Sequence, residues 1–541
     1  MTTGPEQRPG LGDAEAAASE PVPTPPGDAD AAARTTGHGV ALGGLWNSVS
    51  QVLPQAYTLI VSVAAARYLG PAGMGRQSFI AFVEIAAIEL ISGAMKESVT
   101  RHVGETLGRG RPGQVRALLG WAGRVQLVGA LAGGAVLVGV GLAGADPRGA
   151  WIFAGIAGAL AIGQTVQHSA LAGAQRWRDA SVAGLLAGTL AVPAMIVVLA
   201  AGAGITGMFA VEAGAVGLGL IGTAALARRY VQALPADPQL DTSLRSATAR
   251  FAGIATFSVL IHFIIWKRSE FFFLSAYSSD SQIAFYSIAF AAVSGVSLLP
   301  DAMSNSLSPA FATLHGAEAR DRIRSGYWRS QRLLVLMTLP MTAGLIALGP
   351  ELIRLVYGGA YRDTGPILLV LAAIFPLIPL RGVANAFLMG TRRLRFMVIS
   401  EAIAGVVTIG LNFLLVPRFD AIGAAVANTC GQLSVVGPFL VYSGNFLRPV
   451  ALGRRTTAAS LVASAAAGLA AAGALAALGG LPGLLAGGVA GIVVFVAAGA
   501  LLRPLSAEDA TWLDELVRPR LGARAVAGVR LFARGPAQPP P

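Results

Sequence analysis

Cysteine, lysine and histidine are scarce in this sequence, and the motifs that bind nucleotides or catalytic metals are missing. One of the 541 residues is cysteine, Cys430, which excludes an internal disulfide and a multi-cysteine metal site. The 5 histidines lie in different segments without the spacing of metal ligands. The only lysines are Lys96 and Lys267, and there is no GxxxxGK(S/T), HExxH or GxSxG motif. We therefore expect no nucleotide hydrolysis, no catalytic metal and no bound cofactor.

Charged residues are also few. They make up 13% of the chain, about half the share typical of soluble domains, whereas 54% of the residues are hydrophobic. Apolar runs of about twenty residues, long enough to cross the hydrocarbon of a bilayer as helices, recur along most of the sequence. The net charge of +12 does not indicate nucleic-acid binding, because Lys and Arg occur in short clusters between these runs. The pattern predicts a protein that contacts membrane lipids.

The apolar runs and the charged breaks between them predict an all-α integral membrane protein with about fourteen transmembrane helices. The predicted spans are 41–66, 77–97, 117–143, 150–174, 181–203, 205–227, 251–275, 282–311, 331–349, 366–388, 397–416, 421–443, 458–478 and 484–503. Basic residues concentrate in alternate loops and in both tails, which predicts cytoplasmic termini. High Ala, Gly and Arg usage indicates a GC-rich bacterium, so we expect the bacterial cytoplasmic (inner) membrane.

Polar side chains recur at helical spacing inside several spans. An ionised group at the bilayer centre costs about 2.5–3.5 kcal/mol on insertion scales, so such groups usually face a cavity or one another. The aligned residues are Ser294, Ser297, Asp301, Ser304, Asn305 and Ser308; Ser258, His262, Trp266, Ser269 and Glu270; Glu401, Gly405, Thr408 and Asn412; and Asn428 with Gln432. For an uncharged residue in these stripes, the alternative role is a structural hydrogen bond between helices.

Basic residues inside the spans are candidates for contact with an anion. Lys267 has an alternative partner in Glu270, three residues later, whereas Arg124 and Arg381 have no acid one turn away in their own helices. The predicted substrate-binding set is Arg124, Lys267, Arg381, Asn385, Ser304 and Asn305. With no nucleotide site, coupling to a proton or sodium gradient is a hypothesis, and the candidate ion carriers are Glu270, Asp301 and Glu401.

Three stretches resemble the polysaccharide and oligosaccharide flippases (Wzx-like proteins) of the multidrug/oligosaccharidyl-lipid/polysaccharide (MOP) exporter superfamily. These are ARYLGPAGMG at 66–75, ELIRLVYGGAY at 351–361, and NFLLVP at 412–417 followed by AIGAAVA at 421–427. Asp420 stands where the family usually has glycine, and Glu270 stands at its usual acidic position. The resemblance covers most of 41–503.

The resemblance implies two pseudo-symmetric six-helix lobes followed by two accessory helices. On this basis the chain divides into a disordered cytoplasmic tail (1–39), an N-lobe (40–230), a cytoplasmic linker (231–250), a C-lobe (251–444), the last two spans (445–503) and a cytoplasmic amphipathic segment with a disordered tail (504–541). The implied substrate is an undecaprenyl-pyrophosphate-linked glycan moved by alternating access. Candidate partners are glycosyltransferases or a polymerase of the same pathway.

Other functions are compatible with parts of the pattern. A membrane-embedded glycan polymerase or ligase usually has a large outer loop, and every predicted outer loop here is short. A drug/cation antiporter of the same superfamily would use buried acids, and the intramembrane basic residues argue against it. A lipid II flippase shares fourteen helices and a cationic cavity. A non-transporting scaffold for glycan assembly would tolerate loss of Arg124 and Arg381. The sequence thus favours a transporter over an enzyme.

Overall fold

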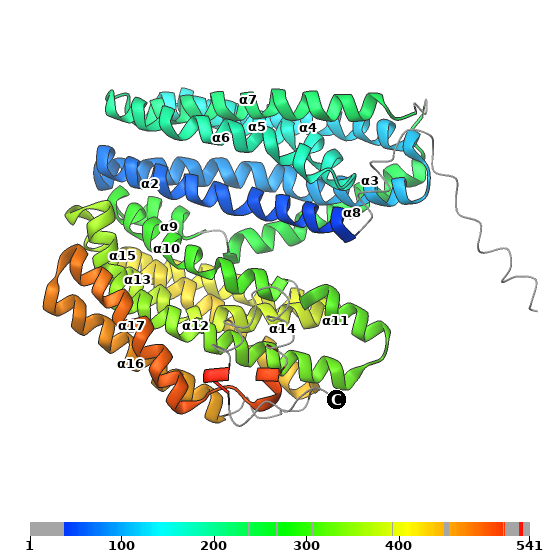
Figure 1. Cartoon of the computed structure of the whole chain (residues 1–541). Helices are drawn as coiled ribbons and strands as arrows, with labels where there is room; N and C mark the ends of the chain where they lie inside the picture. The colour runs from blue at the N-terminus through cyan, green and yellow to red at the C-terminus, as the bar shows by residue number, and fades with distance from the viewer. Residues whose placement is uncertain are drawn as a thin grey trace, which may run out of the picture.

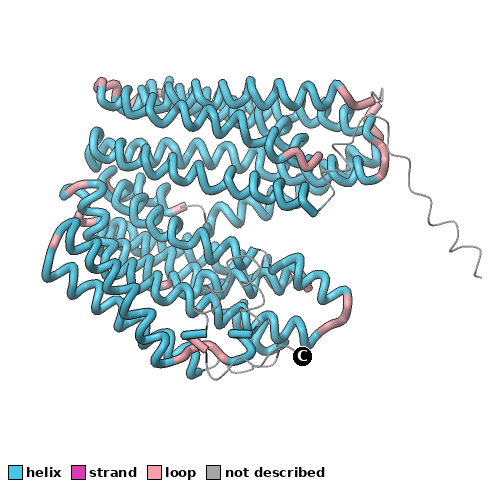
Figure 2. Tube along the Cα trace, in the orientation of Figure 1, coloured by secondary structure: helices cyan, strands magenta, loops and turns pink. Residues whose placement is uncertain are grey.

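The computed structural model of the chain is helical throughout its described part. It describes residues 37–235, 239–266, 269–305, 307–391, 393–447, 454–511, 513 and 530–533. Within these ranges there is no β-strand, and a single isolated bridge pairs Leu505 with Ala533 (Figure 2). The predicted tails, 1–39 and 535–541, lie almost entirely outside the described residues.

The first half of the chain forms a group of helices in the upper part of Figure 1. These are α2 (Gly37–Ile88), the π-helical turn η2 (Glu89–Gly93), α3 (Ala94–Gly108), α4 (Pro112–Leu142), α5 (Arg148–Gly173), α6 (Trp177–Ala200) and α7 (Gly204–Gln232). In this view α4 to α7 lie above α2. The closest packing in this group joins α4 to α5, α5 to α7, α6 to α7 and α2 to α6. We use the name N-lobe for this group, and the predicted boundaries of the lobes stay predictions.

The second half begins with α8 (Thr242–Trp266), which lies beside α3, and its later helices fill the lower part of Figure 1. It continues through α9 (Glu270–Tyr277), α10 (Asp280–Asn305), α11 (Leu307–Gly316), α12 (Arg320–Tyr357), η3 (Gly359–Tyr361), α13 (Thr364–Ala373), η4 (Phe375–Leu377), α14 (Ile378–Gly390), α15 (Leu394–Leu447), α16 (Arg454–Leu478) and α17 (Gly480–Leu502). Helices α16 and α17 pack on each other and on α12, outside the remainder of this group.

Within the described residues, ten helices are long and apolar enough to cross a membrane, or eleven if the bent pair Thr364–Leu377 and Leu380–Gly390 is one span. Two of the ten are each two helices joined at a break, because the backbone is non-helical at Gly70 in α2 and at Asp420 in α15. The prediction of an all-α membrane protein is confirmed. The count of fourteen stays a prediction.

The predicted span at 331–349 is the middle part of a longer helix. Helix α12 begins at Arg320, runs without interruption to Tyr357 and is followed by the turn of η3. Pro350 does not end the helix, although it has no N–H to continue the hydrogen-bond ladder.

The chain turns alternate between two ends of the helix bundle, and Figure 1 shows α2 reversing direction at one of them. Turns at this end, which we call the Gly70 end, lie at Gly70, Gly144, Gly202, Gly358 and Asp420, all with positive φ. Turns at the opposite end, the arginine end, lie at Gly110, Gln175 and Glu318. Arginines adjoin every one of these last three turns. The predicted basic loops therefore share one end.

The two halves pack together through one apolar core near the Gly70 end. Ala65, Met74 and Phe82 of α2 are buried in the same cluster as Phe271 of α9 and Tyr286 of α10. Phe82 contacts the Phe271 ring edge-on, with the ring centroids 5.1 Å apart. Close packing of such large rings stabilises the contact between the lobes.

Candidate functional site

A cluster of three charged residues lies among the helices of the C-lobe. Asp301 comes from α10, Arg381 from α14 and Glu401 from the first part of α15. The guanidinium of Arg381 lies close enough to both carboxylates for their charges to interact. One predicted anion-binding residue and two predicted ion carriers therefore meet in one place, which we call the Arg381 cluster.

The neighbours of the Arg381 cluster fix its position. Ser297, one turn before Asp301, donates a hydrogen bond of 2.8 Å from Oγ to the Asp301 carboxylate. Ser304 is buried against α14, where a Cβ on Gly382 would lie 2.7 Å from the Ser304 Oγ. The stripe predicted on α10 therefore faces α14 at Ser304, and this residue has a packing role besides any contact with substrate.

A second polar group of the C-lobe surrounds Glu270. This residue begins α9, is fully buried, and accepts a 2.9 Å hydrogen bond from Nδ2 of Asn428. Asn428 in turn accepts a 2.6 Å hydrogen bond from Nε2 of Gln432. The predicted pairing of Asn428 with Gln432 on one face is therefore present. Burial of a carboxylate at this depth is costly unless it is hydrogen-bonded, protonated or bound to a cation.

Arg124 lies apart from the Arg381 cluster, on α4 of the other lobe. Its side chain is exposed and donates a 3.1 Å hydrogen bond to the Gly120 carbonyl of its own helix. It shares a helix face with Val128 and Leu131, which are 68% and 65% exposed. An exposed apolar face of this kind suits contact with lipid, and Arg124 extends along it toward the arginine end.

The structure describes the remaining predicted site residues only in part. Asn385 lies one turn after Arg381, and its Nδ2 is 3.9 Å from the sulfur of Met389. The backbone of Asn305 belongs to α10, but its side chain falls outside the part of the structure that is described, as does the whole of Lys267. The binding roles of Asn385, Asn305 and Lys267 stay predictions.

Sequence reasoning missed an acid pair in the N-lobe. Glu84 of α2 is 4% exposed, and its charge interacts with that of Glu212 in α7. Glu212 is the only acid in its predicted span, 205–227, whereas Glu84 shares the span 77–97 with Glu89 and Glu97, so nothing in the sequence distinguishes it. Only the packing of α2 near α7 brings the two together, so no sequence periodicity could have identified the pair.

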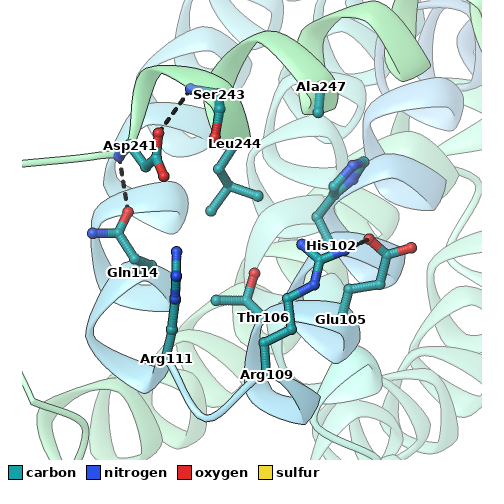
Figure 3. A pocket seen from close by; sticks show the side chains of 10 residues that line it. All are labelled: His102, Glu105, Thr106, Arg109, Arg111, Gln114, Asp241, Ser243, Leu244 and Ala247. Atoms are coloured by element: carbon teal, nitrogen blue, oxygen red, sulfur yellow. Dashed lines mark hydrogen bonds and ion pairs between the residues drawn. The ribbon is translucent and has the colours of Figure 1, made fainter. Parts of the chain in front are cut away.

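A polar cavity of about 300 Å³ lies at the arginine end between α3, α4 and the start of α8 (Figure 3). Gln114 bridges its rim, since Nε2 donates to the Gln239 carbonyl at 3.1 Å and Oε1 accepts from the Asp241 N–H at 2.8 Å. Arg109 lies 3.8 Å from Glu105. The acids around the cavity balance the arginines in number, so the cavity has no excess of positive charge for an anionic ligand. These groups instead hold α8 in place.

Asp241 completes this attachment by capping α8. Its Oδ1 accepts a 2.8 Å hydrogen bond from the Ser243 N–H, and this bonding together with the charge of Arg111 lowers the Asp241 pKa. One further turn along, Ser98 Oγ of α3 donates to the Thr248 carbonyl at 2.9 Å. Helix α8 also packs on α15. It therefore links the N-lobe to the C-lobe.

Comparisons with known proteins agree with this architecture. Residues 154–366 match a family model described as polysaccharide biosynthesis protein. A search of curated proteins finds no match. The solved structure of the lipid II flippase MurJ in an inward closed conformation is similar, with a TM-score of 0.66 and 13% identity over 85% of this chain and 98% of that chain.

Two further similar structures are described as MOP superfamily transporters. An inward-facing multidrug resistance MATE family transporter of the MOP superfamily gives a TM-score of 0.63 and 14% identity, covering 75% of this chain and 98% of that chain. A MOP superfamily transporter from Pyrococcus furiosus gives 0.52 and 14%, covering 74% and 94%. The chain therefore has the fold of MOP-superfamily membrane transporters, and with the match over residues 154–366 this confirms the MOP resemblance predicted from its motifs.

Proposed function

We propose that the protein is a flippase that moves undecaprenyl-pyrophosphate-linked glycans across a bacterial cytoplasmic membrane by alternating access. The match of residues 154–366 to a polysaccharide biosynthesis family is the observation that supports this substrate class best. The arginine end, with the basic loops, would face the cytoplasm together with both termini. The Gly70 end would face outward.

Arg381 is the residue we assign to the pyrophosphate. A guanidinium suits this group because its fork of N–H donors matches phosphate oxygens. Asp301 and Glu401 compete with phosphate for the same charge. Protonation of either acid would weaken that competition and favour the anionic lipid, so substrate binding and proton binding would assist each other. Asn385 and Ser304 would contact sugar hydroxyls or water nearby.

Ion coupling is the second part of the proposal. Glu270, buried and bonded to Asn428, would carry a proton or a sodium ion during the cycle. The Glu270 carboxylate supplies oxygen ligands of the kind that sodium prefers, and Asn428 holds it in place through its Nδ2. Replacement of Glu270 by Gln keeps the hydrogen-bonding shape but removes the charge, so transport by Glu270→Gln should lose its response to an imposed ion gradient while gradient-free exchange persists.

The assignment of Arg381 is tested by glycolipid translocation in proteoliposomes. The measurement follows the accessibility of a labelled undecaprenyl-linked oligosaccharide for the wild type, Arg381→Ala and Arg381→Lys, with Arg124→Ala as the matched control. We expect Arg381→Ala to lower the rate at least tenfold, Arg381→Lys to retain part of it, and Arg124→Ala to match the wild type. Equal rates for Arg381→Ala and the wild type would contradict the assignment.

A drug/cation antiporter is the second candidate, and the buried Glu84 beside Glu212 is the observation that favours it. Buried carboxylates are typical binding groups for organic cations and for the ions exchanged against them. Efflux of a cationic dye against a proton or sodium gradient, abolished by Glu84→Gln, would support the antiporter. Glycolipid movement without dye efflux would support the flippase. If the protein shows neither activity, a scaffold for glycan assembly is the interpretation that remains.

A further inference from the structure

Two of the three sequence motifs meet at the Gly70 end. Arg67 of the first contacts Leu355 of the second, although 288 residues separate them in the chain. The segment at 66–75 forms the reversal of α2, and the segment at 351–361 contains the end of α12 and the turn of η3. The proposed function gives neither motif a role in binding glycan. Their contacts join the N-lobe to the C-lobe, which is the contact that alternating access must open.

Arg67 binds the end of α12. Its Nε donates to the Val356 carbonyl at 2.9 Å, and its Nη2 donates to the Leu355 carbonyl at 2.6 Å. These carbonyls are free for it because α12 ends at Tyr357, where Gly358 takes a φ of 110°. The last carbonyls of a helix have no partner within the helix and carry its partial negative charge, so a guanidinium is the strongest side-chain donor available to them.

Tyr361 makes the reciprocal contact. Its hydroxyl donates at 2.9 Å to the carbonyl of Ala66, in the last turn of α2 before the break at Gly70. The Tyr361 side chain is 1% exposed, so this bond is shielded from water. In each lobe, carbonyl groups at the end of a helix therefore accept hydrogen bonds from a side chain of the other lobe. Neither set of carbonyls keeps its partner when the lobes separate.

Other polar contacts also join the lobes at this end. Arg76 bonds to Asp280 at 2.7 Å and to Asp146 at 2.8 Å, and Ser62 Oγ lies 3.3 Å from the Tyr357 hydroxyl oxygen. Arg67 and Arg76 are both exposed, and exposed charged contacts contribute less to stability than buried ones, so the bond from Tyr361 is better shielded than those from Arg67.

A buried contact lies deeper, where Ser78 Oγ of α2 is 3.1 Å from Ser287 Oγ of α10. It makes a useful reporter, because water and reagents reach it only if the lobes part.

We infer that Arg67 and Tyr361 form a reciprocal latch that holds the Gly70 end closed, and that release of both is required before this end opens. The inference rests on the alternating access proposed above. The latch acts on the conformational equilibrium and not on substrate affinity. Loss of the shielded hydrogen bond made by the Tyr361 hydroxyl should shift that equilibrium about fivefold, and loss of the two solvent-exposed charged bonds of Arg67 by a similar factor of about five.

The experiment measures how fast a thiol at position 78 reacts with a maleimide in purified protein that carries Ser78→Cys and Cys430→Ala. Arg67→Ala and Tyr361→Phe are added separately, and Arg148→Ala, an exposed arginine of the N-lobe at the same end, is the matched control. We expect labelling to accelerate about fivefold with Tyr361→Phe and by a similar factor with Arg67→Ala, and to be unchanged with Arg148→Ala.

Labelling at the unmodified rate in both latch variants would overturn the inference. Tyr361→Phe removes a single oxygen, so it decides the question if Arg67→Ala fails to fold, as judged by size-exclusion chromatography. The measurement needs no substrate. Accelerated labelling in a protein that moves no glycolipid would therefore keep the latch and reject the flippase, whereas glycolipid transport with unchanged labelling would keep the flippase and reject the latch.

Discussion

Asp509 illustrates how one residue can anchor a whole segment. It follows the last helix, and its side chain is completely buried. Arg332 of α12 donates to it at 2.9 and 2.8 Å, and Arg329 donates at 3.2 Å. Burial alone would raise the Asp509 pKa, but the bonds from Arg332, Ser506 and Arg329 outweigh it and lower the pKa. The segment at 504–511 is thereby fixed to the arginine end of the C-lobe.

Replacement of Asp509 by Asn should destabilise the protein by about 2 kcal/mol at pH 7. This is less than the 3–5 kcal/mol for a fully buried pair, because the arginines keep some contact with water. A lowered folded pKa means that the stabilisation is present above the unfolded value of about 3.9 and is lost as the pH falls below it. Thermal unfolding in detergent, from pH 7 to below the unfolded pKa, measures the difference in stability between Asp509→Asn and the wild type. The exposed neighbour Glu508→Gln is the control, and an equal loss in both variants would contradict the prediction.

At the scale of elements, the packing of α2 on α10 depends on Gly75. A Cβ at this position would collide with the backbone carbonyl of Asp280. A backbone atom cannot rotate away as a side chain can, so α2 and α10 would have to separate. Gly120 is also helical but has open space around it. The two glycines therefore differ in their surroundings and not in their helical setting.

Gly75→Ala should open the Gly70 end, and Gly120→Ala should not. The expected effect of Gly75→Ala is faster modification of the thiol at position 78 together with a loss of about 2–3 kcal/mol in stability, as for overpacked sites. Gly120→Ala should be neutral or slightly stabilising, because alanine favours helix. Both are measured by maleimide labelling and thermal unfolding. Matching behaviour of the two variants would show that the α2–α10 contact tolerates a methyl group.

The break in α15 depends on an unusual backbone at Asp420, with φ 49° and ψ −133°. Most residues are strained there, and glycine is not. Ser278 Oγ compensates by donating a 2.6 Å hydrogen bond to the Asp420 carboxylate. Asp420→Ala should therefore cost about 1–2 kcal/mol, whereas Asp420→Gly should be nearly neutral because relief of strain offsets the lost bond. Unfolding of both variants tests this, and a larger loss with glycine would contradict it.

The sequence predicted the elements well because hydropathy and helix length are local properties. Most predicted spans fall within one helix, although others, such as 282–311 and 366–388, extend over two, and the stripe containing Asp301 faces other helices. The partners of these residues could not be predicted, since Asp301, Arg381 and Glu401 come from three helices far apart in the chain. The exposure of Arg124 was missed for a related reason, because an isolated basic residue in a span gives no indication of which side faces lipid.

At the scale of the whole molecule, the lobes meet at the Gly70 end through the apolar core around Phe82 and through the latch of Arg67 and Tyr361. Helix α8 is attached to the N-lobe at the arginine end and packs on α15 of the C-lobe. The account therefore requires that the lobes move apart at the Gly70 end during each transport cycle. A covalent bond across this end should stop transport without unfolding the protein.

The most direct test combines this bond with glycolipid transport. In a Cys430→Ala background, Ser78→Cys and Ser287→Cys place two thiols where the wild-type hydroxyl oxygens are 3.1 Å apart. Proteoliposomes are assayed for movement of the labelled undecaprenyl-linked oligosaccharide under reducing and oxidising conditions, with each single variant as control. The account predicts transport in the reduced protein, its loss on oxidation of the double variant alone, and recovery with reductant. Undiminished transport by the fully cross-linked protein, or no transport by the reduced protein, would contradict it.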